Sequence, residues 1–417
     1  MSTTIGTRPR RLTTLLNVVL GLKQTRVVGV EIDHYGLIID VRPATRLPRC
    51  SGCFYETRKV HDRRERKWRH RDLAGMYVQL RYNLRRVRCP HCGVRAELVP
   101  WAEPKVWFTR EFEDALAYMA QRMDKTTIAD SMRVSWQTVG DVIERVVARS
   151  RSGDALDGLT IIGVDELSYR RHHEYITVVV DHNKGAVVWA GEGKSAETLN
   201  EFFKELGPER TKRLEAVTID MSGAYIKAVS EASPQARIIF DRFHVQRLAH
   251  DALDQVRRAE VREVKGTPDA SSLKGMRWPL QKSPWNLTPR DNDTLDSLER
   301  RNRRLYRAYL LKESLCELLD HADKTDGHKR LDDWMRWARR SRLEPFKRLA
   351  STIETHRDGI IGYIETRLNN GRVEGLNGKI RAITKRSFGF HRAASLIAMV
   401  FLCCSGIVMT AGHMYPT

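Results

Sequence analysis

Three carboxylates stand where they could hold divalent metal ions. Asp165 and Asp220 each end an apolar stretch that we interpret as a β-strand, residues 159–165 and 215–220. Carboxylates at neighbouring strand tips can meet over one edge of a sheet, and such hard oxygen ligands suit Mg²⁺ or Mn²⁺. Two such ions can activate an attacking oxygen and stabilise a leaving one during phosphoryl transfer. Because a single Asp at a strand end is more often a turn cap, each Asp needs partners.

The third candidate ligand is Glu374, which lies near the start of an amphipathic helix. Spacings of three and four residues place Asn377 and Arg381 on the same helix face as Glu374. The opposite face is expected to be buried, and its apolar positions are Leu376, Ile380 and Ile383. The cations expected to grip DNA beside the metal ions are Lys379, Arg381 and Lys385.

Two neighbouring acids complicate the choice of ligands. Glu166 follows Asp165 directly, and successive residues of a strand point to opposite faces of a sheet. Only one of the two can therefore reach the metal ions, and we expect it to be Asp165. Asp181 ends the next predicted strand and is a lesser candidate for a supporting carboxylate.

Four cysteines form two pairs with metal-binding spacing. Cys50-Ser-Gly-Cys53 and Cys89-Pro-His-Cys92 can each present two thiolates from a tight turn, and together they predict one structural Zn²⁺ in a tetrahedral sulfur site. The long spacer between the pairs requires a long hairpin, which residues 61–84 can supply. The alternatives are four unrelated buried thiols, or a histidine ligand in place of one cysteine. The histidines considered for that role are His61 and His70, whereas His91 is expected to face solvent.

The chain carries a large excess of positive charge. It has 72 Lys and Arg against 52 Asp and Glu, a formal net charge of +20 and a pI of about 9.8. Such an excess favours a polyanionic partner, because each neutralised phosphate releases counterions. A dense cationic run surrounds the cysteine pairs, and we expect it to contact phosphate rather than to be only a solvated face. The candidates in this run are Arg63, Arg64, Arg66 and Lys67.

Residues 109–150 have the pattern of three short helices, at 111–121, 127–132 and 135–148. Ser135 is placed as the N-cap of the last helix. The first exposed turn of that helix would carry Trp136, Gln137 and Thr138, where the recognition helix of a helix-turn-helix meets base edges. The alternative is a small linker bundle without DNA contacts.

The region from residue 159 alternates between apolar strands and amphipathic helices. Strands are predicted at 159–165, 174–181, 186–190, 215–220 and 237–241, and helices at 196–206 and 222–233, which together indicate a mixed α/β sheet. From residue 242 the chain reads as helical and charged, with helices at 295–319 and 331–349. Residues 267–289 contain four prolines and read as a loop-rich interruption, where Trp278 and Trp285 are expected in core packing rather than stacked on flipped bases.

Several of these motifs occur together in a known family. The chain resembles the DDE transposases of bacterial insertion sequences, most closely the ISL-three type. The resemblance rests on Asp165-Glu166, on Thr-Ile-Asp-Met-Ser-Gly-Ala-Tyr at 218–225, on Asp-Arg-Phe-His-Val at 241–245, and on Asn-Gly-Arg-Val-Glu-Gly at 370–375. It covers nearly the whole chain, and the order of the motifs is as informative as their content.

The resemblance implies a fold class: a multidomain α/β protein with a ribonuclease-H-like catalytic core and a helical insertion, preceded by a zinc ribbon and a helix-turn-helix. The expected parts are a zinc-binding domain at 1–108, a helix-turn-helix at 109–150, a first core part at 158–245, the insertion at 246–355, and a second core part with the Glu helix at 356–417. It also implies that Asp241 and His244 form a D-x-x-H motif near the DNA or the active site, although a packed helix start would explain them equally well.

The function implied is that of a transposase. It would bind the terminal inverted repeats of an insertion sequence and use two Mg²⁺ or Mn²⁺ ions, held by Asp165, Asp220 and Glu374, to cleave double-stranded DNA and join it to target DNA. A dimer or higher assembly on DNA is expected, because two ends must meet. The alternatives are a non-catalytic DNA-binding regulator built on residues 1–150, and a nuclease of the same fold that cuts without strand transfer.

The compartment follows from the cysteines and the termini. An odd cysteine count of 7 and a polar N-terminus without an apolar leader favour a reducing cytosol. The resemblance implies that this is a bacterial cytoplasm, with the protein associated with the nucleoid. Residues 395–412 are nearly all apolar, but they fall short of a comfortable membrane span, so we expect a buried helix and no membrane contact.

Overall fold

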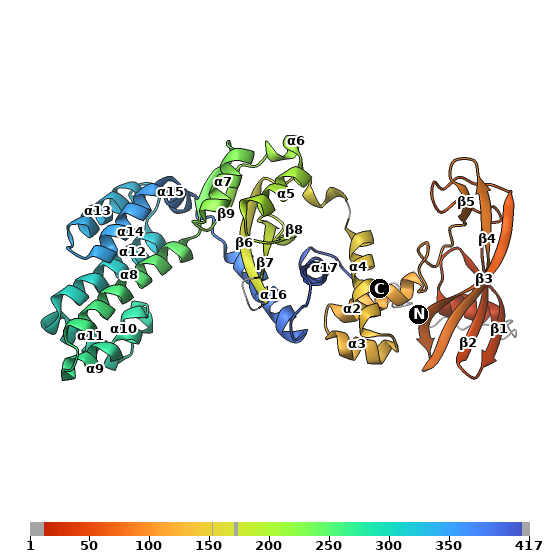
Figure 1. The fold of residues 1–417 in the computed structure, drawn as a ribbon, viewed down its shortest axis with the longest axis horizontal. Helices are drawn as coiled ribbons and strands as arrows, with labels where there is room; N and C mark the ends of the chain where they lie inside the picture. Colours follow the sequence, from red (N-terminus) through yellow and green to blue (C-terminus); the bar gives the residue numbers. More distant parts are fainter. Residues whose placement is uncertain (1–11, 152, 171–173, 411–417) are drawn as a thin grey trace, which may run out of the picture. The chain divides into compact units, whose positions relative to one another are not determined.

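A computed structural model of the chain describes residues 12–151, 153–170 and 174–410. Within these residues the chain forms two compact units (Figure 1). Unit 1 comprises residues 12–151, 386–388 and 398–410, and unit 2 comprises the other described residues. The C-terminal segment, which the sequence grouped with the catalytic core, thus divides between the two units.

Unit 1 contains a five-stranded sheet in the order β1-β2-β4-β3, with β5 paired to β4. The strands are β1 (Thr25–Asp33), β2 (Gly36–Pro43), β3 (Val60–Leu73), β4 (Met76–Cys89) and β5 (Gly93–Ala96), and helix α1 (Leu12–Leu20) packs beside β1. Strands β3 and β4 form the long antiparallel hairpin that the cysteine spacing required. Alternate residues of the strands point inward around the buried Trp68 and Trp101 rings, which meet edge to face.

The three helices predicted after the sheet are present within one or two residues of the expected positions. They are α2 (Arg110–Ala120), α3 (Lys125–Met132) and α4 (Trp136–Ser150). The predicted N-cap is confirmed, because the Ser135 side chain accepts a hydrogen bond from the Thr138 amide. Glu113 is buried on α2 and forms ion pairs with Arg145 and Arg149 of α4, so the two helices are held together by charge as well as by apolar packing.

Unit 2 is built on a second five-stranded sheet, in the order β10-β9-β6-β7-β8. Its strands are β6 (Ile161–Arg170), β7 (Glu174–Asp181), β8 (Ala186–Glu192), β9 (Ala216–Ile219) and β10 (Arg237–Phe240). Strands β6, β7 and β8 form an antiparallel meander, whereas β9 and β10 run parallel to β6. This topology and the helices around the sheet confirm the mixed α/β, ribonuclease-H-like core.

Helices cover both faces of this sheet (Figure 1). One face packs against α5 (Ala196–Leu206) and α7 (Gly223–Ala232), with the short α6 (Pro208–Thr211) between them in sequence. The other face packs against α15 (Arg357–Thr366) and α16 (Gly371–Arg386). Close approach of α16 depends on Gly163, because a Cβ there would lie 2.5 Å from the Val373 side chain.

Between β10 and α15 the chain forms the expected helical insertion. Its long helices are α8 (Arg242–Glu263), α11 (Pro289–Arg301), α12 (Arg303–His321), α13 (Gly327–Arg340) and α14 (Glu344–Thr355). The single helices predicted at 295–319 and 331–349 were wrong: each is interrupted, at Asn302 and at residues 341–343. Asn302 has an extended backbone, and its side chain accepts a hydrogen bond from the Leu305 amide, so it caps a new helix.

The loop predicted at 267–289 was also wrong in part. The segment forms α9 (Pro268–Gly275), α10 (Arg277–Gln281) and a 3₁₀ turn at Pro284–Asn286, because proline is tolerated in the first turn of a helix. The expected core packing of Trp278 and Trp285 is corrected as well, since their exposed fractions are 66% and 71%.

The apolar C-terminal stretch forms helix α17 (Ala393–Cys404), whose side chains are largely buried, as predicted for residues 395–404. The prediction was wrong for residues 405–410, which are not helical and include the exposed Val408. In unit 1 the Gln121 side chain donates hydrogen bonds to the carbonyls of Leu402 and Ile407, at 2.8 and 3.0 Å. Residues 411 and 412 lie outside the described part of the chain. None of the described helices is both long and apolar enough to cross a membrane.

Candidate metal centres and nucleic-acid interface

Asp165 and Asp220 lie side by side because of the register of two parallel strands. Gly163 of β6 pairs with Thr218 of β9, and each Asp lies two residues beyond this pair. The prediction that Asp165 ends its strand was wrong: β6 continues to Arg170, since residues 165–170 keep pairing with β7. Asp220 follows β9 directly, as predicted, and its Oδ1 accepts a hydrogen bond of 2.9 Å from the Ser222 amide.

A third acid occupies the same row. Phe240 of β10 pairs with Ile219 of β9, so Asp241, which comes next and begins α8, lies beside Asp220. Its carboxyl is buried, and its Oδ1 accepts a bond of 3.5 Å from the Asn370 amide. Three adjacent parallel strands therefore each present an aspartate at one edge of the sheet.

Helix α16 brings Glu374 to this edge. Asn377, one turn after Glu374, donates from Nδ2 to Asp165 Oδ2 at 2.6 Å. The expected face assignment needs correction, because Asn377 is buried together with Val373, Ile380 and Ile383, whereas Leu376 is only half-buried. The spacing of three residues correctly placed Asn377 beside Glu374, but it did not show that a carboxylate on the sheet buries and satisfies Asn377.

Burial and mutual repulsion perturb the acids of this group. Desolvation raises the pKa of Asp165, and Asp220 raises it further, while the Glu166 amide and His244 act in the opposite direction. Desolvation and the charges of Asp241 and Asp165 raise the pKa of Glu374. Each charged carboxylate thus disfavours the charged form of its neighbours, and bound cations would relieve this repulsion.

Glu166 points to the other face of the sheet, as the alternation of side chains predicts. It pairs with Thr177 of β7, whose hydroxyl lies 2.9 Å from the Tyr225 hydroxyl of α7. Its pKa is raised by burial and by Asp220 and Asp165. Asp181 does not join the group, because its Oδ1 accepts bonds from the Asn183 and Lys184 amides and closes the β7–β8 turn.

The donor set fits divalent cations. Within the described residues, two buried oxygens beside Asp165 and Glu374 have no hydrogen-bond partner, and these are Asp241 Oδ2 and Asn377 Oδ1. Buried acceptors without donors are costly in apo form and suit a positively charged ligand. His244, in the first turn of α8, lowers the pKa of Asp165, Asp241 and Glu374 through its charge, so it also lies close to this group.

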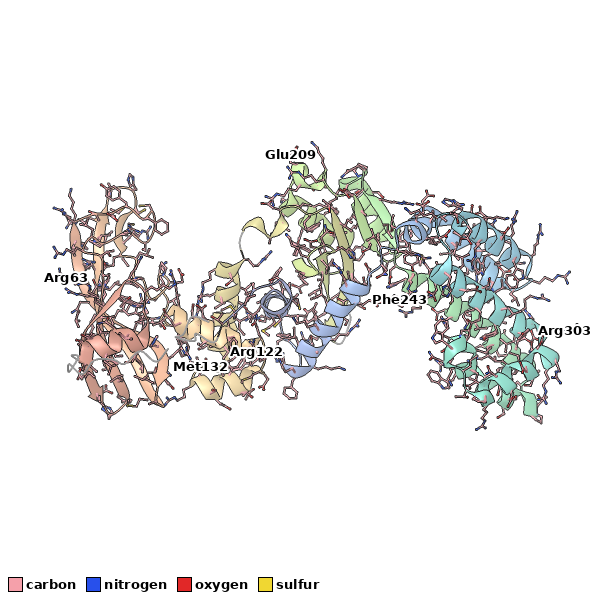
Figure 2. The ribbon with its side chains drawn as sticks, turned by 180° about the vertical axis from the view of Figure 1, so that it is seen from behind. Arg63, Arg122, Met132, Glu209, Phe243 and Arg303 are labelled. Carbon is pink, nitrogen blue, oxygen red and sulfur yellow. The ribbon has the colours of Figure 1, made fainter. Side chains whose placement is uncertain are left out.

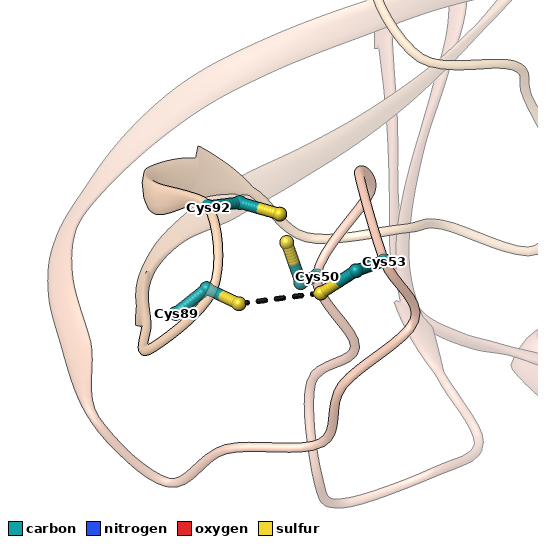
Figure 3. Close-up of side chains that lie close together, drawn as sticks. All are labelled: Cys50, Cys53, Cys89 and Cys92. Carbon is teal, nitrogen blue, oxygen red and sulfur yellow. Dashed lines mark hydrogen bonds between the residues drawn. The ribbon is translucent and has the colours of Figure 1, made fainter.

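The four cysteines of unit 1 gather at the end of the β3–β4 hairpin (Figure 3). Their sulfur atoms all lie within 4.8 Å of one another, and the Sγ atoms of Cys53 and Cys89 are 3.4 Å apart. Gly52 and Gly93 shape the two turns: a Cβ at Gly52 would lie 3.2 Å from Cys92 Sγ, and Gly93 has φ +71°. Four thiols converging in this way fit a tetrahedral metal ion and contradict the alternative of four unrelated thiols.

The histidines considered as replacement ligands lie elsewhere in the described structure. His70 is buried against α2, where its Nδ1 is 2.8 Å from the Thr109 hydroxyl. His61 is exposed beside Arg88, and His91 is exposed as predicted, with its ring against Tyr55.

The N-terminal turn of α4 is largely open. Trp136 and Gln137 are exposed, and Lys125 lies 4.2 Å from the centre of the Trp136 ring. The Thr138 side chain is half-buried and lies 2.8 Å from the Ser135 hydroxyl, so part of its hydrogen-bonding capacity serves the cap. The Gln137 amide donates to Asp141 Oδ1 at 2.9 Å, so part of the hydrogen-bonding capacity of Gln137, like that of Thr138, is used within α4.

The cationic side chains of strand β3 differ in how exposed they are and in whether they are bonded to other residues. Arg63 and Arg64 are exposed, and Figure 2 shows Arg63 projecting from the strand, whereas Lys67 is half-buried. Arg66 donates to the Val106 carbonyl at 2.9 Å and stacks on Trp107 at 4.4 Å. Arg69, in the same strand, is buried beneath Tyr77 and paired with Asp72. On α16, Lys379, Arg381 and Lys385 are exposed.

Known proteins share these segments in the same order. Residues 162–400 match a family of transposases of the DDE type named ISL3, residues 97–147 match the helix-turn-helix domain of transposase family ISL3, and residues 46–92 match the zinc-finger of transposase IS204/IS1001/IS1096/IS1165. The transposase for insertion sequence element IS1557 of Mycobacterium tuberculosis is 36% identical over 94% of this chain and 95% of its own length. The transposase for insertion sequence element IS1001 of Bordetella parapertussis is 28% identical over 88% of this chain and 91% of its own length.

Proposed function

The chain belongs to the ISL3 family of insertion-sequence transposases, and from this premise we propose which of its residues break and join DNA. It is a DDE transposase, an enzyme that uses divalent metal ions and binds DNA. The observation that carries the residue assignment is the row of Asp165, Asp220 and Asp241 on adjacent strands, with Glu374 brought to it by α16.

We assign Asp165, Asp220 and Glu374 as the metal-binding catalytic carboxylates, with two Mg²⁺ or Mn²⁺ ions per site. When bound, the two cations activate the attacking oxygen and stabilise the leaving oxygen of an in-line phosphoryl transfer. Water would first hydrolyse the phosphodiester bond at the end of the element, leaving a 3′-OH on the element and a 5′-phosphate on the flanking DNA. That 3′-OH would then attack a phosphodiester of the target DNA and displace its 3′ oxygen, so that one ester bond replaces another. No nucleophilic side chain is needed.

The chain's own residues orient this chemistry. Asn377 fixes the Asp165 carboxylate through its 2.6 Å hydrogen bond, so that the other oxygen keeps its direction. Asp241 and His244 support the site as a buried carboxylate and a nearby imidazole at the start of α8. The exposed Lys379, Arg381 and Lys385 continue along α16 from Glu374, where cations can hold the phosphates of the substrate strand.

Unit 1 holds the ends of the element. The four cysteines bind one structural Zn²⁺, which ties the two turns of the ribbon together. We propose that Trp136, Gln137 and Thr138 contact base edges of the terminal inverted repeats, and that Arg63, Arg64 and Lys67 contact phosphate. The stacking of Arg66 on Trp107 favours a structural role for that side chain.

We also propose how the protein assembles and where in the cell it acts. Two element ends must be joined in one event, so we propose a dimer or higher assembly on DNA. Because its substrate is chromosomal and element DNA, we propose that the protein works in the bacterial cytoplasm at the nucleoid. We likewise propose that the functional parts are a zinc-binding domain at 1–108, a helix-turn-helix at 109–150, core parts at 158–245 and 356–417, and an insertion at 246–355, with residues 386–388 and 398–410 grouped by their contacts with unit 1.

Alanine variants of the three carboxylates test the assignment. Purified protein with DNA that carries the element ends, and with Mg²⁺, is expected to nick at the ends. Asp220→Ala and Glu374→Ala should lose cleavage by at least about 1000-fold, because each removes a ligand of the catalytic cations, and should keep end binding. Asp181→Ala is the matched control, since Asp181 is a buried strand-end carboxylate that bonds the Asn183 and Lys184 amides and pairs with the Lys184 side chain at 3.6 Å, away from Asp165 and Asp220. Normal cleavage by Glu374→Ala would refute the assignment.

A further inference from the structure

A chain of buried polar side chains runs beneath the start of α16. His182 follows β7, Thr218 lies in β9 and Asn370 precedes α16, and their exposed fractions are 6%, 0% and 2%. His182 Nε2 lies 2.7 Å from Thr218 Oγ1, and the Thr218 hydroxyl is hydrogen-bonded to Asn370 Oδ1. The three residues come from distant parts of the sequence and meet inside the core, where no ligand or solvent requires a polar group.

The direction of each hydrogen bond follows from the chemistry of the groups. Asn370 Oδ1 can only accept, so the Thr218 hydroxyl donates to it. The Thr218 oxygen is then free to accept from His182, whose Nε2 carries the proton. The Ile162 carbonyl of β6 also lies 3.5 Å from the Thr218 oxygen, at the limit of hydrogen bonding, so Asn370 Oδ1 is the closer acceptor. A rotated or shifted α16 would break the bond between Thr218 and Asn370.

This series of hydrogen-bonded side chains ends at the helical turn that carries Glu374. The Glu374 amide donates to the Asn370 carbonyl at 2.7 Å, and the Asn370 amide donates to Asp241 Oδ1 at 3.5 Å. Arg372, within the same turn, is hydrogen-bonded to the His182 carbonyl. The first turn of α16 is thus bonded at both of its ends to the segment that follows β7 and to the start of α8.

Close packing leaves the hydrogen-bonded side chains of His182 and Thr218 little room to move. A Cβ at Gly163 would lie 2.8 Å from His182 Nε2 and 2.9 Å from Thr218 Oγ1, as well as 2.5 Å from Val373. The polar chain and the helix start are therefore pressed directly against β6, two residues before Asp165. Apolar side chains could fill this space at lower desolvation cost, but they would not specify the rotation of α16.

We propose that Thr218, with His182 and Asn370, positions Glu374 toward Asp165 and Asp220 by fixing the first turn of α16. The three are positioning residues, because they act through the helix and touch neither DNA nor metal. This inference rests on the proposed catalytic role of Glu374. A displacement of about 1 Å at a reacting group can cost about 100-fold in rate, so loss of one buried hydroxyl should be felt in catalysis.

The test compares Thr218→Val, which keeps the shape and removes the hydroxyl, with Thr218→Ser, which keeps the hydroxyl. Thr211→Val is the matched control: Thr211 is also buried in unit 2, and its hydroxyl bonds only the Gly207 carbonyl, at 2.8 Å. The full-length variants are assayed for end cleavage at saturating DNA and Mg²⁺, for DNA affinity, for half-saturating Mg²⁺, and for amide hydrogen exchange of residues 368–377.

Thr218→Val is expected to cleave about 10- to 100-fold more slowly and to need more Mg²⁺, with DNA affinity unchanged and faster exchange in the first turn of α16. Thr218→Ser should restore most of the rate, and Thr211→Val should match the native protein in all four measurements. If Thr218→Val does not fold, His182→Gln, which retains a donor, and His182→Leu, which does not, provide the same contrast.

The possible failures can be told apart. Cleavage at the native rate by Thr218→Val, with native exchange at 368–377, would overturn the positioning role while leaving the catalytic carboxylates in place. Equal loss in Thr218→Ser and Thr218→Val would also overturn it, because shape rather than the hydroxyl would then matter. Normal cleavage by Glu374→Ala would instead overturn the function on which the inference rests.

Discussion

His70 shows how a single buried side chain can couple folding to pH. Its imidazole is buried between β3 and α2 and bonded to the Thr109 hydroxyl, which also caps α2. Desolvation, with smaller effects of Arg71 and Arg69, lowers its pKa from 6.5 to about 4. Because the folded state then binds fewer protons than the unfolded state, the stabilisation is complete above the unfolded pKa and is lost as pH falls toward the folded pKa.

We therefore predict that acid destabilises unit 1 between pH 6.5 and about 4. Within this window the free energy of unfolding should fall by up to about 1.4 kcal/mol per pH unit, or about 3 kcal/mol in total. Amide exchange of β3 and α2 in the full-length protein, measured across this range, reports the loss. His70→Gln should flatten the dependence at the cost of lower stability near neutral pH, and parallel pH profiles for the two proteins would contradict the prediction.

Single residues were predictable where their surroundings are local. The Ser135 cap, the outward direction of His91 and the opposite faces of Asp165 and Glu166 follow from short-range rules. The burial of Asn377 was not predictable, because its partner Asp165 lies far away in sequence. The exposure of Trp278 was not predicted for a similar reason: the way helices α8, α9, α10, α11 and α12 pack together determines which aromatic side chains of the insertion are exposed to solvent.

At the scale of elements, the strand and helix pattern of the unit 2 sheet could be read from periodicity, and β7 was predicted at its observed residues. The errors concern where elements end. β6 extends past Asp165 because pairing with β7 continues through the polar residues up to Arg170. The break at Asn302 depends on one side-chain cap, which periodicity does not register. Tertiary pairing and capping, not propensity, therefore set the limits of these elements.

Two elements of unit 1 should contribute to DNA binding in different ways. Gln137 on α4 can read base edges, so Gln137→Ala should weaken binding to the element ends by about 1–3 kcal/mol and leave binding to unrelated DNA unchanged. Arg63 on β3 is assigned to phosphate, so Arg63→Ala should weaken binding to both DNAs and reduce the slope of log affinity against log salt concentration by about 1.

Fluorescence anisotropy with end and scrambled duplexes at several salt concentrations measures both effects. Arg145→Ala is the control cation, because Arg145 is bonded to the buried Glu113 and its loss should act through stability and not through the salt slope. If Gln137→Ala weakened binding to both duplexes equally, α4 would not be the element that reads sequence.

At the scale of the whole molecule, function depends on cores that are separate. The apolar core of the unit 1 sheet, the small cluster of Cys50, Val87 and Cys89, and the large core of unit 2 share no buried residue in the described chain. The order of these parts was predictable from motifs. The division of the C-terminal segment between the units was not, because Gln121 and the carbonyls it binds are distant in sequence.

Loss of zinc should therefore unfold the zinc ribbon and leave the other parts of the molecule folded. The cysteine cluster buries few apolar side chains of its own, so the ribbon's turns depend on the metal ion, and apparent zinc-dependent stabilisation of such sites is about 10–16 kcal/mol. Cys92→Ser should lower the zinc content below half an equivalent per chain and abolish end-specific DNA binding. It should leave unchanged the melting transition of unit 2, followed by amide exchange in β6 and β9, because that core contains no cysteine ligand.

Cys316→Ser, a change at a cysteine of the helical insertion, should keep both zinc and end binding. Full zinc content in Cys92→Ser would show that the metal ion is held by other residues, and faster exchange in β6 would show that the units do not fold independently.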